Sequence, residues 1–174
     1  GNLPYTDNLV NLVVAGRRCR VPDAEIARVL APGGVAVMEF SADAGLSLPD
    51  VKPSGLEPRW VSTLPSWVVC VKSRPEGMDD WTHYLHDADN NAVAADSVVG
   101  PPRRLQWVAG PRWSRHHDRM SSISAVVSAG GRVFSIVDEG SPAAIVLPAD
   151  WKLVARDAFN GVLLWKKTIP QWHP

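Results

Sequence analysis

Apolar and polar positions follow two different patterns along the chain, and the first pattern covers residues 1–74. Residues 9–14 and 35–40 are nearly continuous apolar runs, typical of strands buried on both faces of a sheet. Between them, Ile26, Val29 and Leu30 have helical spacing, which predicts a short helix over 24–30 with Asp23 as its N-cap. These elements indicate an α/β half.

Glycine and proline divide the rest of this half. Pro32-Gly33-Gly34 is predicted to end the helix before the second strand. Residues 41–58 contain many Pro, Gly and Ser and are predicted to form a loop. Residues 60–63 and 67–71 flank Leu64-Pro65-Ser66, which suggests an antiparallel hairpin. We predict a linker over 75–80.

After the linker, the pattern changes to that of a β protein. Two strands are predicted around the turn Gly130-Gly131, and two more follow the turn Asp138-Glu139-Gly140. The four predicted strands are 121–128, 132–138, 151–155 and 162–169.

The composition excludes several classes of protein but does not indicate a function. The 18 basic and 18 acidic side chains balance, so overall charge gives no pull toward nucleic acid or an anionic membrane. No apolar stretch approaches the length of a membrane span. Two cysteines are too few for a disulfide scaffold, and Cys70, within an apolar strand, is expected to be a small buried residue rather than a nucleophile.

One motif near the end of the chain is more specific. Residues 155–165 have the spacing Ala-x-Asp-x-x-Asn-Gly-x-x-x-Trp, with Ala155, Asp157, Gly161 and Trp165 at its marked positions. This run resembles the tryptophan-docking repeat of quinoprotein-like β-propellers. The resemblance implies that Ala155 allows close packing, that Gly161 takes the turn, and that Trp165 docks flat between adjacent blades. An ordinary hairpin with a surface tryptophan is the alternative.

The segment before these strands agrees with that family. Asp80-Trp81, the turn around Asn90-Asn91 and the strand predicted at Leu105-Gln106-Trp107 resemble the entry segment that precedes the first blade. We therefore expect residues 81–174 to be an entry segment and the first four-stranded blade of a propeller.

The first half resembles the C-terminal part of a class I, type 11 methyltransferase that uses S-adenosylmethionine. The match lies in the strand entry at residues 3–14 and in Glu25-Ile26-Ala27-Arg28-Val29-Leu30-Ala31-Pro32-Gly33-Gly34. The predicted final hairpin suits that family's last two strands. The resemblance implies a partial Rossmann-like sheet over 1–74.

The departures from that family limit what it implies. The glycine-rich turn that cradles the cofactor and the acidic residue that holds its ribose are both missing, and Asn11 stands where the family usually has Asp. One blade cannot close a ring, and half a parallel sheet leaves an open edge. We therefore expect the chain to be a junction fragment, as in large planctomycete-type fusion proteins.

Several side chains were weighed as ligands or catalysts. His83, His86, His116 and His117 suggest a metal or a haem ligand, but hydrogen-bonded histidines at the domain junction are favoured. Turn-forming roles are favoured over calcium binding for the acidic residues Asp79, Asp80, Asp87 and Asp89. Ser121 and Ser122 lack the context of a nucleophile.

A cluster of arginines interleaved with tryptophans has two interpretations. Such a composition is typical of a single-strand nucleic-acid surface and equally of arginines stacked on docked tryptophans, and we favour the second. The residues are Arg103, Arg104, Trp107, Arg112, Trp113, Arg115 and Arg119.

These observations predict a binding or assembly scaffold whose partners are the remaining blades, the upstream methyltransferase half and other proteins. The alternative is an enzyme in the intact chain. Methyl transfer with S-adenosylmethionine is then favoured over a quinone- or haem-linked oxidoreductase that uses pyrroloquinoline quinone (PQQ). Catalytic and cofactor-binding residues cannot be assigned, and the fragment alone is expected to be inactive. We expect an extracytoplasmic location, with the cytoplasm as the alternative.

Overall fold

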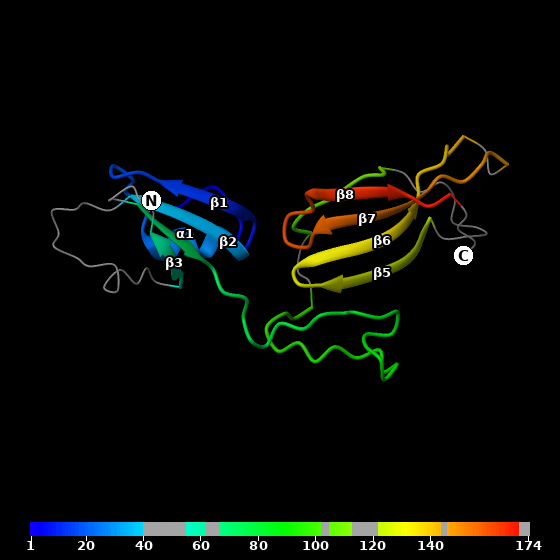
Figure 1. The fold of residues 1–174 in the computed structure, drawn as a ribbon, viewed down its shortest axis with the longest axis horizontal. Coiled ribbons are helices and arrows are strands. Elements are labelled where there is room, and N and C mark those ends of the chain that lie inside the picture. Colours follow the sequence, from blue (N-terminus) through cyan, green and yellow to red (C-terminus); the bar gives the residue numbers. More distant parts are fainter. Residues whose placement is uncertain (40–54, 62–66, 102–104, 113–121, 144–145, 171–174) are drawn as a thin grey trace. The chain divides into compact units, whose positions relative to one another are not determined.

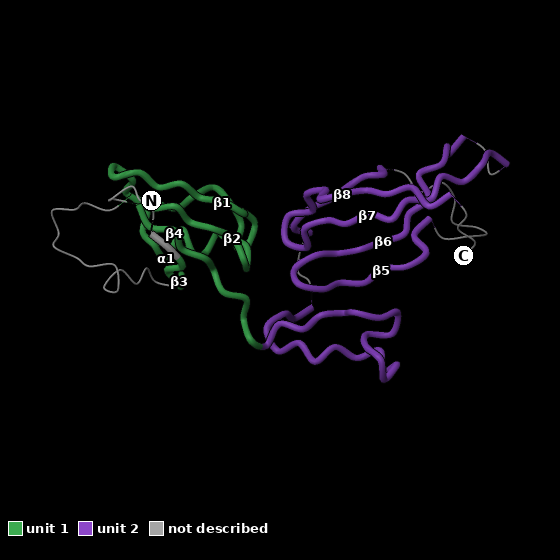
Figure 2. The backbone as a smooth tube through the Cα atoms, in the orientation of Figure 1, with its two compact units in different colours: residues 1–76 green, residues 77–174 purple. Residues whose placement is uncertain are grey.

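The chain forms two compact units, Gly1–Glu76 and Gly77–Pro174 (Figures 1 and 2). The structure is a computed structural model that describes residues 1–39, 55–61, 67–101, 105–112, 122–143 and 146–170. It is mostly β, with one helix and two four-stranded sheets in the described residues, one sheet in each unit. None of the described helices is both long enough and apolar enough to cross a membrane.

The first unit is a mixed sheet with a helix on it. The strand order is β1-β2-β4-β3, and β1 and β2 are parallel while the other pairs are antiparallel. The elements are β1 (Val10–Ala15), α1 (Asp23–Val29), β2 (Leu30–Glu39), β3 (Glu57–Val61) and β4 (Trp67–Val71). The predicted hairpin is thus present, although β3 begins at Glu57, inside the stretch that we predicted to be loop.

The core of this unit lies between α1 and one face of the sheet. Ile26, Leu30, Met38, Val68 and Cys70 belong to one buried cluster there. Cys70 is fully buried, as predicted, and burial raises the pKa of its thiol.

The prediction that residues 9–14 are buried on both faces is wrong. Leu12 and Val14 on β1 are 56% and 62% exposed, whereas Val13 packs against the core. The strand lies at the sheet edge, and alternate side chains point away from the helix side. An apolar run therefore marked a strand with only one buried face.

The start and end of α1 also differ from prediction. The N-cap residue is Pro22 and no side chain caps the helix, while Asp23 lies in the first turn, where its charge favours the helix dipole. The helix ends at Val29, before Pro32-Gly33-Gly34, which belongs to β2. These residues form an irregularity in the β1–β2 register, and Gly33 adopts φ of 81°.

Lys72 binds carbonyl groups at the end of α1. Its ammonium donates hydrogen bonds to the carbonyls of Ala27 (2.7 Å) and Leu30 (2.9 Å) and to Asn8 Oδ1 (2.6 Å). A lysine at this end of a helix satisfies carbonyl groups that have no partner within the helix. Desolvation by burial lowers the pKa of Lys72.

The second unit is an antiparallel meander in the order β5-β6-β7-β8 (Figure 1). Its strands are β5 (Ile123–Ala129), β6 (Arg132–Asp138), β7 (Trp151–Asp157) and β8 (Leu163–Thr168). Gly130 and Gly131 form the β5–β6 turn with φ of 57° and 74°, a backbone conformation that suits glycine in a tight hairpin. All four strands lie close to the predicted ranges.

Asp80 and Trp81 fix the segment before the sheet to the end of β5. Trp81 N donates to Ser128 Oγ (3.1 Å), Ser128 N donates to Trp81 O (2.7 Å), and both oxygens of Asp80 accept from Gly130 N. Leu105-Gln106-Trp107, which we predicted as a strand, is not one in the structure.

Candidate docking site on the second unit

The turn at residues 157–161 joins β7 to β8 and is built by the motif residues. Asp157 Oδ1 accepts hydrogen bonds from the backbone N–H groups of Phe159 (2.8 Å) and Asn160 (3.1 Å). Gly161 N donates to Asp157 O (3.0 Å), and Gly161 has φ of 73°. An aspartate that accepts from the N–H groups two and three residues on, and a glycine with positive φ, together fix the shape of the turn.

Trp107 lies against this turn from a distant part of the chain. Its indole N–H donates to Ala158 O (2.9 Å), and its ring packs so closely on Gly161 that a Cβ there would come within 2.6 Å of Trp107 Cδ2. Gln106 Nε2 donates to Phe159 O (2.9 Å) beside it. Glycine is therefore required at position 161 for two reasons, its φ and the close approach of the ring.

Sequence reasoning missed this role of Trp107. The signals were available as Leu105-Gln106-Trp107 and the glycine of the motif, but nothing in the pattern paired them. Trp107 is the tryptophan that docks on the 157–161 turn, whereas docking of Trp165 between adjacent blades stays a prediction.

Ala155 and Trp165 contribute to a second feature, on the sheet itself. Ala155 pairs with Phe134 on one side and with Trp165 on the other, so the two rings flank a methyl group on one face. Their centroids are 6.1 Å apart, and Ala155 is fully buried. Trp165 remains 44% exposed.

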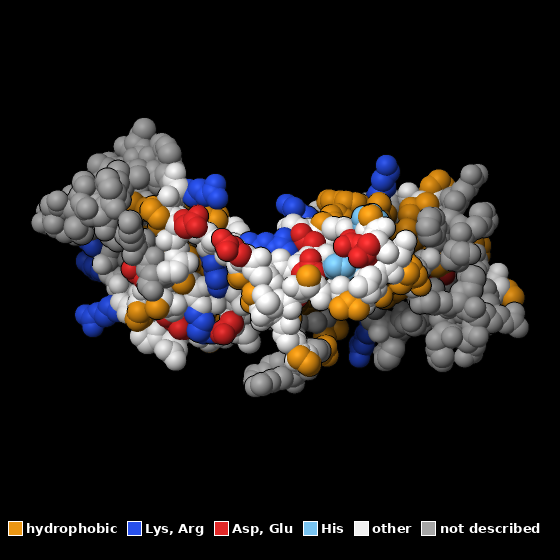
Figure 3. All heavy atoms as spheres, turned by 90° about the horizontal axis from the view of Figure 1, so that it is seen from below, with side chains coloured by type: hydrophobic (Ala, Val, Ile, Leu, Met, Phe, Trp, Pro, Cys, Tyr) orange, Lys and Arg blue, Asp and Glu red, His pale blue; other side chains and the backbone are white. Residues whose placement is uncertain are grey.

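We call this surface the docking face and define it as Val127, Phe134, Ile136, Leu153 and Trp165. Four of these residues, without Trp165, line a shallow apolar hollow of about 100 Å³. Hydrophobic side chains are also visible among the charged ones on the surface in Figure 3. The exposed indole beside an apolar hollow makes this face suited to contact with another apolar surface.

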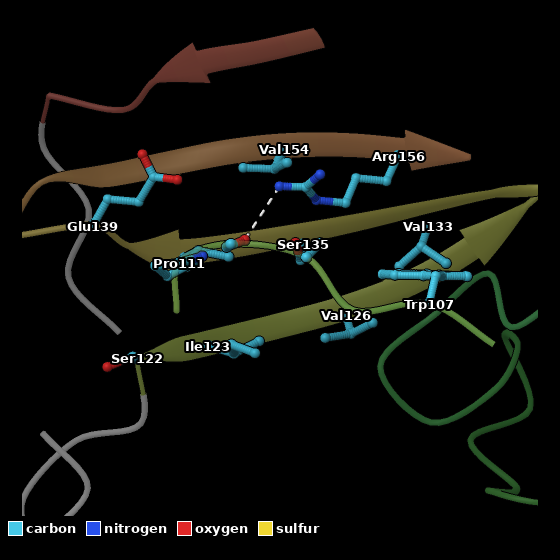
Figure 4. A pocket seen from close by; sticks show the side chains of 13 residues that line it. Trp107, Pro111, Ser122, Ile123, Val126, Val133, Ser135, Glu139, Val154 and Arg156 are labelled. Atoms are coloured by element: carbon cyan, nitrogen blue, oxygen red, sulfur yellow. Dashed lines mark hydrogen bonds between the residues drawn. The ribbon is translucent and has the colours of Figure 1, made fainter. Parts of the chain in front are cut away.

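The opposite face of the same sheet holds a larger cavity of about 310 Å³ (Figure 4). Its floor is formed by side chains of β5, β6 and β7, and residues 107–111 cover part of it. Arg156 fixes this cover, because its guanidinium donates to Gly110 O (3.2 Å) and to Gly161 O (3.0 Å). The lining residues are Trp107, Ala109, Gly110, Pro111, Ser122, Ile123, Val126, Val133, Ser135, Val137, Glu139, Val154 and Arg156.

The residues that we weighed as metal ligands have other partners. His86 is buried and its Nε2 lies 2.6 Å from Asp79 Oδ2, while His83 Nδ1 lies 2.9 Å from Thr82 Oγ1. The pKa of Asp79 is lowered by the backbone N–H of Ala95 first and by His86 second. Among the described residues, no three His, Cys, Asp or Glu side chains are placed to hold one metal ion.

The remaining acidic residues of the entry segment hold turns. Asp87 Oδ1 accepts from Asp89 N (2.8 Å), Asp89 Oδ1 accepts from Asn91 N (2.7 Å), and Asp96 Oδ1 accepts from the N–H groups of Val98 and Val99. For Asp87 and Asp89 these contacts are the turn-forming roles that we favour over calcium binding, whereas Asp79 and Asp80 accept from residues farther along the chain, Ala95 and Gly130.

Other candidates lie outside the described residues, namely His116, His117, Ser121, Arg103, Arg104, Arg115, Arg119 and Trp113. Ser122 is described and buried at the rim of the cavity. Arg112 is described and exposed.

Comparisons with known proteins add no relative. No protein-family model matches the chain, and neither the curated proteins nor the solved structures contain a match.

Proposed function

We propose that residues 77–174 form a blade of a quinoprotein-like β-propeller and act as a binding and assembly module. The observation that carries the proposal is the seat of Trp107 on the 157–161 turn. Asp157 and Gly161 of the motif build a turn that receives the indole of Trp107. This contact supports the resemblance to the repeat, although the resemblance itself implies docking of Trp165 between adjacent blades. A four-stranded antiparallel meander with the motif across β7 and β8 supports it further.

The docking face is the surface through which this module would assemble. Its proposed occupant is another antiparallel sheet, that of a neighbouring blade, because flat faces of β-branched and aromatic side chains pack on sheets of the same kind. Trp165 is central, since large aromatic side chains dominate the energetics of such contacts.

Sedimentation velocity of the full chain over a range of concentrations tests this assignment. In this experiment the sheet of a second copy takes the place of the neighbouring blade, so we expect concentration-dependent association. We expect Trp165→Glu to weaken it about tenfold or more, because a charge would be buried in the contact. Val146→Glu is the matched control, since Val146 is 91% exposed in the β6–β7 loop and is not among the residues that define this face. A wild-type chain that stays monomeric, or equal association of both variants, would contradict the proposal.

A second candidate, methyl transfer, is favoured by one observation on the first unit. The parallel pair β1 and β2 is joined by α1 and followed by the antiparallel hairpin β3–β4, as the resemblance to a methyltransferase implies. We expect the first unit to keep the methyltransferase-like fold without the methyltransferase activity. Titration calorimetry with S-adenosylmethionine should then give no heat of binding, and saturable heat would instead favour the enzyme.

A further inference from the structure

We infer that the 310 Å³ cavity on the face opposite the docking face binds a small apolar molecule that bears one carboxylate. This inference does not rest on the propeller assignment, because it uses the cavity and its charges alone.

The wall of the cavity is apolar over most of its area. Val126, Val133, Val137 and Val154 supply it from three adjacent strands, and Trp107 and Pro111 lie over it (Figure 4). Small-molecule sites usually combine such a wall with a few polar groups that orient the ligand.

The charges at the cavity favour an anion. Both hydrogen bonds of the Arg156 guanidinium go to neutral carbonyl oxygens, and no carboxylate pairs with it in the described part of the chain. Glu139, the acidic residue of the lining, is instead held by Lys166, whose ammonium lies 2.7 Å from both of its oxygens. Among the residues that the structure describes, the cavity therefore presents one cation, Arg156, without an acidic partner.

Arg156 has spare hydrogen-bonding capacity for such a group. A guanidinium carries five N–H donors in a planar arrangement that matches a carboxylate, and the two carbonyl contacts use only part of them. Ser135, on the neighbouring strand β6, lines the same cavity and can add a hydroxyl donor.

The size of the cavity limits the ligand to a small molecule. A volume of about 310 Å³ lies at the lower end of known ligand sites. It corresponds to the space of about ten water molecules, at about 30 Å³ each. A bicyclic aromatic carboxylate such as 2-naphthoate is therefore a suitable probe.

Titration of the full chain with 2-naphthoate, followed by NMR chemical shifts, tests the inference. We expect saturable binding at one site, at least tenfold tighter than for the uncharged 2-naphthylmethanol. Arg156→Met should remove this preference for the anion, while binding of the alcohol changes little.

A second pair of variants keeps the test valid if Arg156→Met disturbs the cover over the cavity. Val126→Trp fills the cavity from β5 and should weaken naphthoate binding at least tenfold. Val127→Trp changes the next residue, which lies on the docking face, and should leave binding unchanged. Absence of saturable binding, equal affinity for acid and alcohol, or equal effects of the two tryptophan variants would overturn the inference.

Discussion

Trp107 and Gly161 lie in direct contact, and the contact joins two segments that are far apart in the sequence. The indole ring rests where a Cβ of residue 161 would be, and its N–H reaches the carbonyl of Ala158, 51 residues along the chain. The turn of the motif and the tryptophan that precedes the sheet therefore form one structural element.

Gly161→Ala should destabilise the second unit by about 1–3 kcal/mol, because alanine disfavours the positive φ and its methyl group would overlap the Trp107 ring. Urea unfolding followed by tryptophan fluorescence measures this change. Gly100→Ala is the control, since a Cβ at Gly100 meets nothing within 4 Å. Equal midpoints for the two variants would show that the ring does not sit on Gly161.

Trp107→Phe should cost about 1–2 kcal/mol, since phenylalanine keeps a ring on Gly161 but leaves the carbonyl of Ala158 without its donor. Trp81→Phe is the comparison. The Trp81 indole N–H makes only a long, exposed contact of 3.4 Å with Tyr84 O, so its loss should cost less. If the two variants unfold at the same urea concentration, the hydrogen bond to Ala158 adds nothing to stability.

Lys72→Met should destabilise the first unit by about 1–3 kcal/mol, because the carbonyl of Ala27 in α1 and that of Leu30, which follows the helix, lose a charged donor in a partly buried place. Hydrogen exchange of amides in α1 and β2 reports on this unit separately from the other. Arg59→Met, at an exposed position on β3, serves as the control. Unchanged protection in the Lys72 variant would refute this role.

Acid should weaken the first unit through Glu25, whose pKa is lowered from 4.5 to about 2 by the Arg28 side chain first and by the Leu3 backbone N–H second. A pKa that is lower in the folded state means that the stabilisation is complete above pH 4.5 and is lost as the pH falls toward 2.

Protection of α1 amides between pH 2 and 6 measures this effect. Glu25→Gln should flatten the pH dependence, whereas Glu57→Gln, at an exposed position on β3, should not. Identical profiles for wild type and Glu25→Gln would contradict the assignment.

The local sequence pattern was sufficient to predict the strands of the second unit. It was not sufficient to predict which distant residues contact each other. The range 132–138 was predicted from alternation and a glycine turn, because both signals lie within a few residues of the strand. Lys72 and Asn8 are 64 residues apart, and Trp107 and Ala158 are 51 apart. The periodicity of apolar residues within one strand or helix therefore does not indicate either contact.

Burial was predicted less well than secondary structure. The run at β1 has the composition of a strand buried on both faces, yet Leu12 and Val14 are exposed, because burial depends on which neighbours cover a face and not on the run itself. The same holds for the cavity. Arg156 on β7 and Glu139 just after β6 line the same cavity only because these strands pair, and the absence of a carboxylate partner for Arg156 among the described residues is visible only in three dimensions.

The contrast between Trp107 and Trp165 tests the central claim, that one indole is already docked within the chain while the other serves assembly. ¹⁹F NMR of the chain labelled with 5-fluorotryptophan resolves them, with resonances assigned by Trp107→Phe and Trp165→Phe. As protein concentration rises, the account predicts that the Trp165 resonance shifts or broadens while that of Trp107 stays fixed. A Trp165 resonance that is independent of concentration would contradict it.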